Sequence, residues 1–357
     1  MHRASLAAVV ILSASSLAQA ADAPPLVHEA VLNVPVQKVW EVFATAEGYK
    51  HWGVAHAEVD LRVGGLIRSV YNPSATIGDA STIEQTILAY DPLKMIAFRC
   101  TRTPEGFPFP DAMRQTWSVA TLDDLGNNRT RLTLKGFGYT DAEDSMKMRT
   151  FFEAGNAWSL EKLRAALEGT PAPTRDPHAA AKEGGDAMDI SPPRLISETG
   201  GSGPIEVEAV LPASLASVWN TWTSGPAMSK ALDIHADIQL RIGGPFELHF
   251  DQAAPEGSRG SEGCAVLAYE PMRMLSFDWN APPQFAHARG ERTWVVVRFE
   301  ELAPERTRVS LTHHGWQEKL ASQPEHSAQW AEVRAYFTKA WPTLMGWMQQ
   351  GVAKNTP

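Results

Sequence analysis

The sequence predicts two tandem copies of an α+β unit built on an antiparallel sheet. Three observations lead to this prediction. The chain has 357 residues, which is more than one compact domain usually holds. It aligns with itself over a long stretch at an offset of 179 residues. Each copy has β-rich runs between a short and a long helical segment, which is typical of α+β folds.

The internal repeat runs through most of each copy. EAVLNVPVQKVW at 29–40 matches EAVLPASLASVW at 208–219, and HAEVDLRVGG from His56 matches HADIQLRIGG from His235. A period this long indicates duplicated domains rather than a solenoid of short units.

The repeat and the composition together set the domain boundaries. We expect the first domain at residues 26–168 and the second at residues 205–352. Residues 169–204 are rich in proline, glycine and alanine and show no sustained apolar period. This composition predicts a flexible linker between the two domains.

Residues 1–20 have the pattern of a secretory signal peptide. Arg3 precedes an apolar run from Leu6 to Leu17, and Ala18-Gln19-Ala20 is a small-x-small cleavage site. The run is short for a bilayer span. We therefore expect cleavage after Ala20 and a mature protein that is periplasmic or secreted. Once the signal peptide is removed, we expect no stable membrane anchor.

The composition limits the classes of partner. Hydrophobic residues make up 44% of the chain and charged residues 20%, as in soluble globular domains. The formal net charge is −9 and no run is rich in lysine or arginine, which argues against nucleic-acid binding. The two cysteines, Cys100 and Cys264, occupy non-equivalent points of the repeat. We expect buried free thiols rather than a disulfide framework.

Each copy begins with a strand followed by a helix. Strands are predicted at 26–32 and 205–211. In the first copy a helix follows, because the apolar residues recur at helical spacing at Val36, Val39, Trp40 and Phe43.

The motif that starts at His56 indicates a half-buried strand leading into a hairpin. Apolar residues at 59, 61 and 63 alternate with His56, Glu58, Asp60 and Arg62, and the copy at His235 alternates in the same way. The His–acid pair supplies two metal ligands at most and no third follows by spacing, so we expect no metal site.

Two glycine pairs end this motif, and they predict a tight turn in which positive φ favours glycine. The pairs are Gly64-Gly65 and Gly243-Gly244.

Further β-rich runs follow, and a long helix closes each copy. Thr140 is the predicted N-cap of the first long helix. The direction of Trp294 stays open, because Val295, Val297 and Phe299 form a competing inward row.

Taken in order, these motifs resemble the START-like (SRPBCC) helix-grip superfamily. The marks are VW…F in the first helix, DLRVGG and QLRIGG at the hairpin, YDPLKMIAF and YEPMRMLSF, and TRLTLKGFGY and TRVSLTHHGW. The chain is most similar to the branch named after the heat-shock protein 90 ATPase activator. The resemblance implies a curved antiparallel sheet wrapped around a long C-terminal helix, with a cavity between them. Since this fold hosts carriers, cyclases and chaperone regulators, it implies no single chemistry.

His313 is the polar residue on which the two copies differ most clearly. It shares its parity with Val309 and Leu311, so we expect it to face inward and His314 to face outward. Gly136 takes the equivalent place in the first copy. Two interpretations stay open: a polar anchor for a ligand, or a core histidine with both ring nitrogens hydrogen-bonded.

Large aromatic side chains are the other candidates for a cavity lining, because ligand pockets are mostly apolar with few polar groups. The candidate ligand-binding residues are His313, Trp279, Phe250, Trp341, Tyr336, Tyr71, Phe98 and Trp158. No nucleophile, phosphate-loop or metal motif is found, so no catalytic residue and no cofactor is assigned.

The function that these features favour is binding of a small hydrophobic or amphipathic molecule in the cavity of one or both domains, by an exported protein. Two alternatives remain. One is a cyclase- or hydrolase-like enzyme that uses His313 and cavity residues of the second domain. The other is a protein-interaction or chaperone-like module that binds a protein partner.

Overall fold

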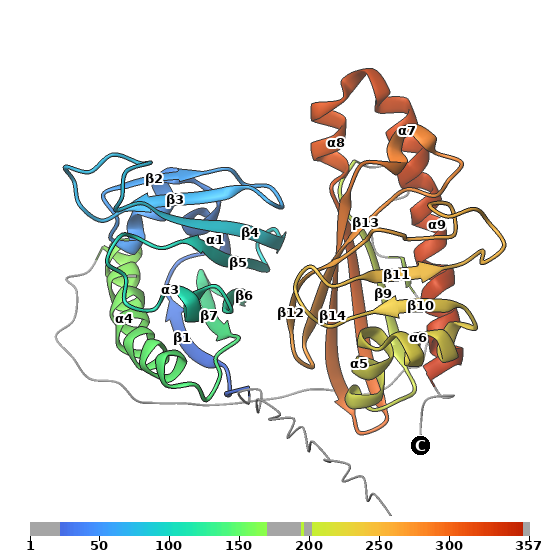
Figure 1. Cartoon of the computed structure of the whole chain (residues 1–357), viewed down its shortest axis with the longest axis horizontal. Helices are drawn as coiled ribbons and strands as arrows, with labels where there is room; N and C mark the ends of the chain where they lie inside the picture. Colours follow the sequence, from blue (N-terminus) through green and yellow to red (C-terminus); the bar gives the residue numbers. More distant parts are fainter. Residues whose placement is uncertain (1–21, 170–193, 196–201, 353–357) are drawn as a thin grey trace, which may run out of the picture.

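Two units with the same order of elements follow one another along the chain (Figure 1). The computed structural model describes residues 22–169, 194–195 and 202–352. The predicted signal peptide and most of the predicted linker lie outside the described residues. Among the described residues, none of the helices is both long enough and apolar enough to cross a membrane.

The first unit contains seven strands, three short α-helices, a 3-10 helix and one long helix at its end. Its elements are β1 (Leu26–Leu32), α1 (Val36–Ala44), α2 (Ala46–Tyr49), the 3-10 helix η1 (Lys50–Trp52), β2 (His56–Val59), β3 (Leu66–Val70), β4 (Ile83–Asp91), β5 (Met95–Arg102), α3 (Pro110–Met113), β6 (Trp117–Gly126), β7 (Arg129–Phe137) and α4 (Glu143–Glu168).

The second unit repeats this order and adds a short helix before the last one. Its elements are β9 (Ile205–Leu211), α5 (Leu215–Thr223), α6 (Gly225–Leu232), β10 (His235–Ile238), β11 (Phe246–His249), β12 (Val266–Glu270), β13 (Met274–Trp279), α7 (Ala286–Arg289), β14 (Thr293–Ala303), β15 (Arg306–His314), α8 (Trp316–Ser322), the 3-10 helix η2 (Pro324–His326) and α9 (Ser327–Gly351). Within the predicted linker, β8 (Arg194–Leu195) pairs with β9.

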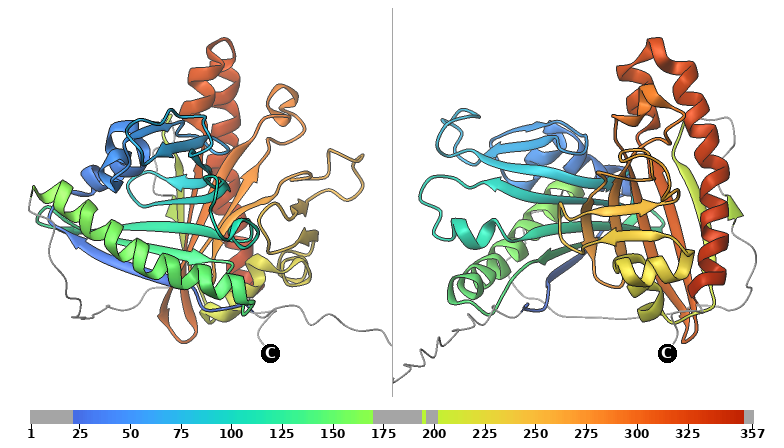
Figure 2. Two further views of the ribbon diagram at one scale, coloured as in Figure 1. Left: turned by 60° about the vertical axis from the view of Figure 1, so that its left-hand side comes forward. Right: turned by 45° about the vertical axis from the view of Figure 1, so that its right-hand side comes forward.

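Both units have a curled antiparallel sheet with the long helix laid across it, as Figure 2 shows for α4 and α9. In the first unit the strand order is β1-β7-β6-β5-β4-β3-β2. In the second unit β12-β13-β14-β15-β9-β8 form one sheet, and β10 and β11 form a separate hairpin. The predicted α+β class and the helix-grip architecture are thereby confirmed.

Two local details differ from or refine the sequence predictions. The helix α4 begins at Glu143 after Ala142, and no side chain caps it, so Thr140 is not its N-cap. Cys100 and Cys264 are both free and buried, as expected. Burial raises the pKa of Cys100 to about 11 and that of Cys264 to about 12, which keeps both thiols protonated.

The glycine pairs form the turns that tie each first hairpin to the next strand. Gly64 and Gly243 have φ of 78° and 75°, in the left-handed region. Gly65 and Gly244 do not have a positive φ. However, a Cβ on Gly65 would lie 2.1 Å from a backbone oxygen, and a Cβ on Gly244 would lie 2.4 Å from one. Both members of each pair exchange backbone hydrogen bonds with the following strand. The first glycine of each pair is thus required for its φ, and the second for lack of space.

The two units pack against each other through the outer faces of their sheets, with α4 and α9 on the far sides (Figure 1). Along β14, residues 295, 297 and 299 belong to the core of the second unit. Trp294 and Val296 point the other way and join the core of the first unit. This β14 segment is therefore buried on both faces, which settles the direction of Trp294.

The interface is reciprocal. The Trp294 indole N–H donates to the Tyr90 carbonyl at 2.9 Å, and the Trp117 indole N–H donates to the Tyr269 carbonyl at 3.0 Å. The ring centroids of the two pairs lie 4.9 and 4.8 Å apart. Each tryptophan and each tyrosine has its repeat equivalent in the other pair. The same surface patch is thus used twice, as in a twofold-symmetric dimer.

Buried acids extend the reciprocal contact. Asp91 pairs with Arg298 of the second unit at 2.5 Å, and Glu270, its repeat equivalent, pairs with Lys135 of the first unit at 2.5 Å. Both carboxylates are nearly inaccessible to solvent, so these two ion pairs lie inside the contact between the units. His314 also lies here, 3.5 Å from Asp91 and stacked on Trp294. It faces outward from its own sheet as predicted, yet it is buried, because the first unit covers it.

Replacing Gly244 by valine should destabilise the protein. The new side chain would begin 2.4 Å from the Gln239 carbonyl oxygen, and relieving such overpacking costs about 1–3 kcal/mol. Thermal melting of the full chain measures the loss. Gly290→Val is the control, because a Cβ there meets nothing within 4 Å. An unchanged melting temperature for Gly244→Val would contradict the steric role of this glycine.

Trp294→Phe should weaken the contact between the units. It leaves the Tyr90 carbonyl without its donor in a buried setting, for which we expect a loss of about 1–3 kcal/mol in the unfolding free energy, measured in urea. The control is Trp158→Phe, whose tryptophan is exposed. Equal losses in the two variants would show that the reciprocal contact contributes no more than an exposed tryptophan.

Candidate functional site

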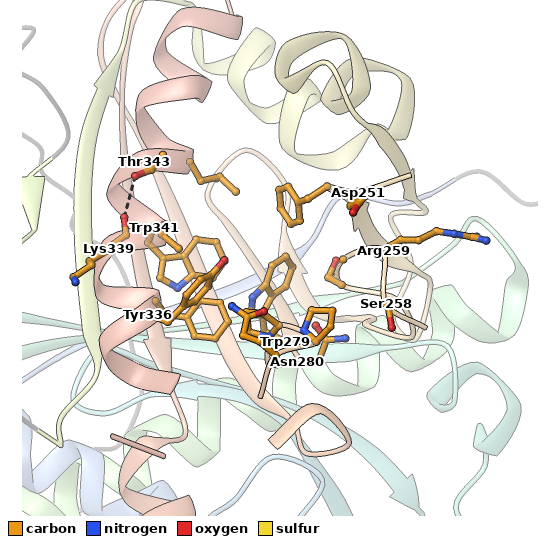
Figure 3. A pocket seen from close by; sticks show the side chains of 18 of the residues that line it. Asp251, Ser258, Arg259, Trp279, Asn280, Tyr336, Lys339, Trp341 and Thr343 are labelled. Carbon is orange, nitrogen blue, oxygen red and sulfur yellow. Dashed lines mark hydrogen bonds between the residues drawn. The ribbon is translucent and has the colours of Figure 1, made fainter. Parts of the chain in front are cut away.

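The best-formed cavity found in the described residues lies in the second unit, between α9 and the loop that joins β11 to β12. Its volume is about 870 Å³, within the range of sites for small organic ligands. In Figure 3, Tyr336, Trp341 and Thr343 come from α9 on one side, and Asp251, Ser258 and Arg259 come from the loop on the other. Trp279 and Asn280 lie between these two walls.

The lining is mainly aromatic. Rings of Trp279 and Trp341 lie 5.2 Å apart, and those of Trp341 and Phe337 are stacked at 5.9 Å. Phe250, Tyr336 and Trp347 also line the cavity, although 44%, 39% and 50% of their surfaces are exposed. The cavity therefore presents large apolar side chains to solvent, where a bound molecule would cover them.

Charged side chains contribute little to the space between the walls. Figure 3 shows the side chains of Arg259 and Lys339 extending away from it. Asp251 accepts a hydrogen bond from the Ala253 amide, which uses one carboxylate oxygen to shape the loop. The indole N–H of Trp279 donates no hydrogen bond within the described part of the chain. It is thus a donor that a ligand oxygen can use.

A second, smaller cavity of about 350 Å³ adjoins the first. It extends toward α6 and shares Phe250 and Trp347 with the larger cavity. These two side chains therefore form the boundary between the cavities.

His313 lies behind the aromatic wall and is fully buried. Its Nδ1 accepts a hydrogen bond from the Trp341 indole N–H at 2.8 Å, so the proton of the neutral ring is on Nε2. Nε2 then donates to the Thr293 hydroxyl at 2.8 Å, and that hydroxyl donates to the Trp279 carbonyl. This chain of hydrogen bonds links both tryptophans of the cavity wall.

The ring of His313 is held neutral. Burial lowers its pKa well below 6.5, and the charges of His314 and Arg334 act in the same direction. Since both ring nitrogens are engaged and the residue does not line the cavity, the interpretation as a core histidine is the one that the geometry supports.

The equivalent helix position in the first unit has the opposite arrangement. Trp341 is 2% exposed, whereas Trp158 is 54% exposed and carries the Lys162 ammonium group over its ring at 3.6 Å. Gly136 replaces His313 there and offers no acceptor, and the Tyr139 ring fills the adjacent space. Without the histidine, the tryptophan lies on the surface.

The predicted ligand-binding residues therefore divide into two groups. Trp279, Phe250, Trp341 and Tyr336 line the large cavity. The other four do not. His313 lies behind the wall, Tyr71 is exposed, Trp158 is exposed, and Phe98 packs against Phe43 in the core of the first unit.

Several lining residues were not predicted. Trp347 continues the helical spacing from Tyr336 through residues 340, 343 and 344, so this face of α9 was visible in the sequence. The loop residues at 251 and 258–261 carry no such period, and only the folded chain brings them opposite the helix.

The duplicated His–acid motif forms no site. Along β10, His235 and Asp237 are exposed, and Ala236 and Ile238 are buried, as the alternation predicted. In β2, His56 bonds the Pro73 carbonyl and Glu58 pairs with Arg68, so the two side chains serve different partners. Among the described residues, no group of three histidine, cysteine or carboxylate side chains is placed to hold a metal ion.

Tandem helix-grip units with a cavity between sheet and last helix define a START-like protein. Comparison with protein families agrees with this class. The family described as activator of Hsp90 ATPase homolog 1-like protein matches residues 33–168 and 212–340. Because these two regions make up well over half of the chain, the chain belongs to this family. No curated protein matches the sequence.

Solved structures with similar folds include single and double units. The di-domain ARO/CYC BexL of the BE-7585A biosynthetic pathway is 11% identical, with 92% of this chain and 99% of that chain covered and a TM-score of 0.34. Protein MLL2253 from Mesorhizobium loti is 17% identical, with 42% and 99% covered and a TM-score of 0.34. The Aha1 dimer from Colwellia psychrerythraea is 16% identical, with 41% and 97% covered and a TM-score of 0.33.

His313 should make stability depend on pH below neutrality. Its folded pKa is depressed, so as the pH falls below 6.5 the unfolded chain takes up a proton that the folded chain does not, and folding is disfavoured. Between pH 7 and 5.5 this contributes a loss of about 1 kcal/mol. Urea unfolding at the two pH values measures this loss of unfolding free energy. In the His313→Gln variant, the contribution of His313 to the loss should be absent. An identical pH dependence in both proteins would mean that His313 titrates normally when folded.

Proposed function

We propose that this chain binds a small hydrophobic or amphipathic molecule in the large cavity of the second unit. The observation that carries the proposal is the aromatic lining, in which Phe250, Tyr336 and Trp347 are each exposed by more than a third at one concave site. Covering apolar surface stabilises a complex by about 25 cal/mol per Å², before the costs of association.

The shape of the lining favours a ligand with a flat apolar body. Trp279, Trp341 and Phe337 form a continuous aromatic wall on which a planar group can stack. The indole N–H of Trp279 lies at the same wall, where it can orient a ligand oxygen, whereas the Asn280 amide group donates to the Glu262 carbonyl at 3.1 Å.

The compartment we propose is the periplasm or the exterior of the cell. The support is the signal-peptide pattern of residues 1–20. In this setting the protein would hold its ligand outside the cytoplasm.

The enzyme alternative has less support. It assigned acid–base chemistry to His313, whose two ring nitrogens are both hydrogen-bonded inside the protein. An exposed apolar patch between the units would have favoured the alternative of a protein-interaction module. The apolar outer faces of the two sheets instead cover one another.

A tryptophan introduced into the cavity should block binding. Ala335 lines the cavity and is exposed on α9, so Ala335→Trp fills space without disturbing the core. Titration calorimetry with anilinonaphthalene sulfonate as the probe should show an affinity lower by about tenfold or more, or roughly 1.4 kcal/mol. Ala331→Trp, on the same helix and outside the lining, is the matched control. If both variants bind the probe equally well, the cavity is not the binding site.

The natural ligand is best sought by native mass spectrometry of the full chain purified from its own host. A small molecule that copurifies with the protein and is absent from Ala335→Trp would support the proposal. A wild-type protein that carries nothing and binds no apolar probe would overturn it.

A further inference from the structure

The wall opposite α9 is an irregular loop that side-chain contacts to its backbone help to shape. Residues 250–262 contain no helix or strand, yet they supply Phe250, Asp251 and residues 258–261 to the cavity lining. The loop makes a few backbone hydrogen bonds of its own, among them one from the Asp251 amide to the Arg259 carbonyl at 2.9 Å, and side-chain contacts to its backbone add to them. The question is which side chains make these contacts.

Arg289, at the end of α7, makes the main contacts to this loop. Its Nε donates to the Gly257 carbonyl at 2.9 Å, and one terminal nitrogen donates to the carbonyls of Gly257 at 2.6 Å and Gly260 at 2.8 Å. The other terminal nitrogen donates to the Ala281 carbonyl at 2.6 Å. One guanidinium group thus joins the loop to the segment that carries Asn280 and Pro282, which also line the cavity.

Glu262, the last residue of this loop, adds two contacts to its backbone. Its carboxylate accepts hydrogen bonds from the Gly257 amide at 2.8 Å and the Arg259 amide at 2.7 Å, and it lies 3.5 Å from Arg289. Burial opposes the ionised form, but the backbone N–H groups of residues 257, 259 and 260 keep the pKa of Glu262 below its usual value. The carboxylate is therefore a permanent acceptor near neutral pH.

The returning end of the loop is fixed against β11. The Ser261 hydroxyl accepts from the Leu248 amide at 2.8 Å and donates to the Phe246 carbonyl at 3.2 Å. A Cβ on Gly260 would lie 1.8 Å from the Leu248 oxygen, so the backbones approach as closely as glycine permits. The contacts with β11 fix this end, so Arg289 acts mainly on the outer part of the loop, at Gly257.

We propose that Arg289 is a positioning residue that sets the width of the cavity, and with it the size of the molecule that the cavity accepts. This rests on the proposed function. A planar guanidinium reaches several carbonyls in fixed directions at once, whereas a lysine ammonium group is a single point that cannot span them. With lysine in this place, the loop would move away from α9 and larger molecules would enter.

The first unit provides a matched comparison. Its corresponding loop, between β3 and β4, is also held by an arginine: Arg102, at the end of β5, donates to the carbonyls of Gly78 at 3.3 Å and Asp79 at 2.6 Å. Arg102 lines neither of the two cavities described above. Arg102→Lys is therefore a matched control. It weakens the contacts to a similar loop that does not line the proposed binding cavity.

The test uses the full chain and two probes of different size, anilinonaphthalene sulfonate and its covalent dimer. In Arg289→Lys, loss of one or two charge-assisted hydrogen bonds should speed amide hydrogen exchange at 250–262 by about tenfold or more. The affinity for the dimer relative to the monomer should rise several-fold. Arg102→Lys should speed exchange at 71–82 and leave the affinity ratio unchanged. If Arg289→Lys does not fold, Glu262→Gln weakens a second set of contacts to the same loop.

The outcomes separate this inference from the proposed function. If the loop exchanges faster but the affinity ratio does not change, the width of the cavity is not set by Arg289, and the binding function stands. If exchange at 250–262 is unaffected, Arg289 does not hold the loop and the inference fails. If neither probe binds the unaltered protein, or both bind equally to Ala335→Trp, the proposed function fails first.

Discussion

The burial of both faces of each sheet is the constraint on which this structure depends. A sheet with apolar side chains on two faces needs two covers. In each unit the long helix covers the inner face, and the other unit covers the outer face. The reciprocal bonds from Trp294 to Tyr90 and from Trp117 to Tyr269 satisfy polar groups that this packing buries. Duplication of a self-complementary surface therefore explains why the two units stay together.

The two copies share one fold but differ in the position of the tryptophan on the long helix. In the second unit, His313 accepts the indole N–H of Trp341 and keeps that ring in the core, where it becomes part of the cavity wall. In the first unit, Gly136 provides no acceptor, and Trp158 lies exposed. One polar side chain thus separates an aromatic cavity wall from a surface residue. His313 therefore affects the shape of the cavity indirectly, because it holds Trp341 in the cavity wall.

The cavity joins a regular wall to an irregular one. The α9 wall follows helical spacing from Tyr336 to Trp347. The loop wall follows no period and depends on hydrogen bonds that Arg289 donates to backbone carbonyls and that Glu262 accepts from backbone amides. Side-chain contacts to backbone carbonyls leave no pattern in a sequence, because any residue supplies a carbonyl. This is why the aromatic half of the site could be predicted and the loop half could not.

The sequence by itself determined the duplication, the order of strands and helices, the glycine turns and the inward direction of His313, because each follows from local periodicity or from a repeat. Only the tertiary structure decided whether the outward-facing residues are buried or exposed. His314 and Trp294 point away from their own core and are nevertheless buried, since a second sheet lies over them. The alternation of a strand tells which side chains share a face. What covers that face depends on residues about 200 positions away, which meet it only in the folded chain.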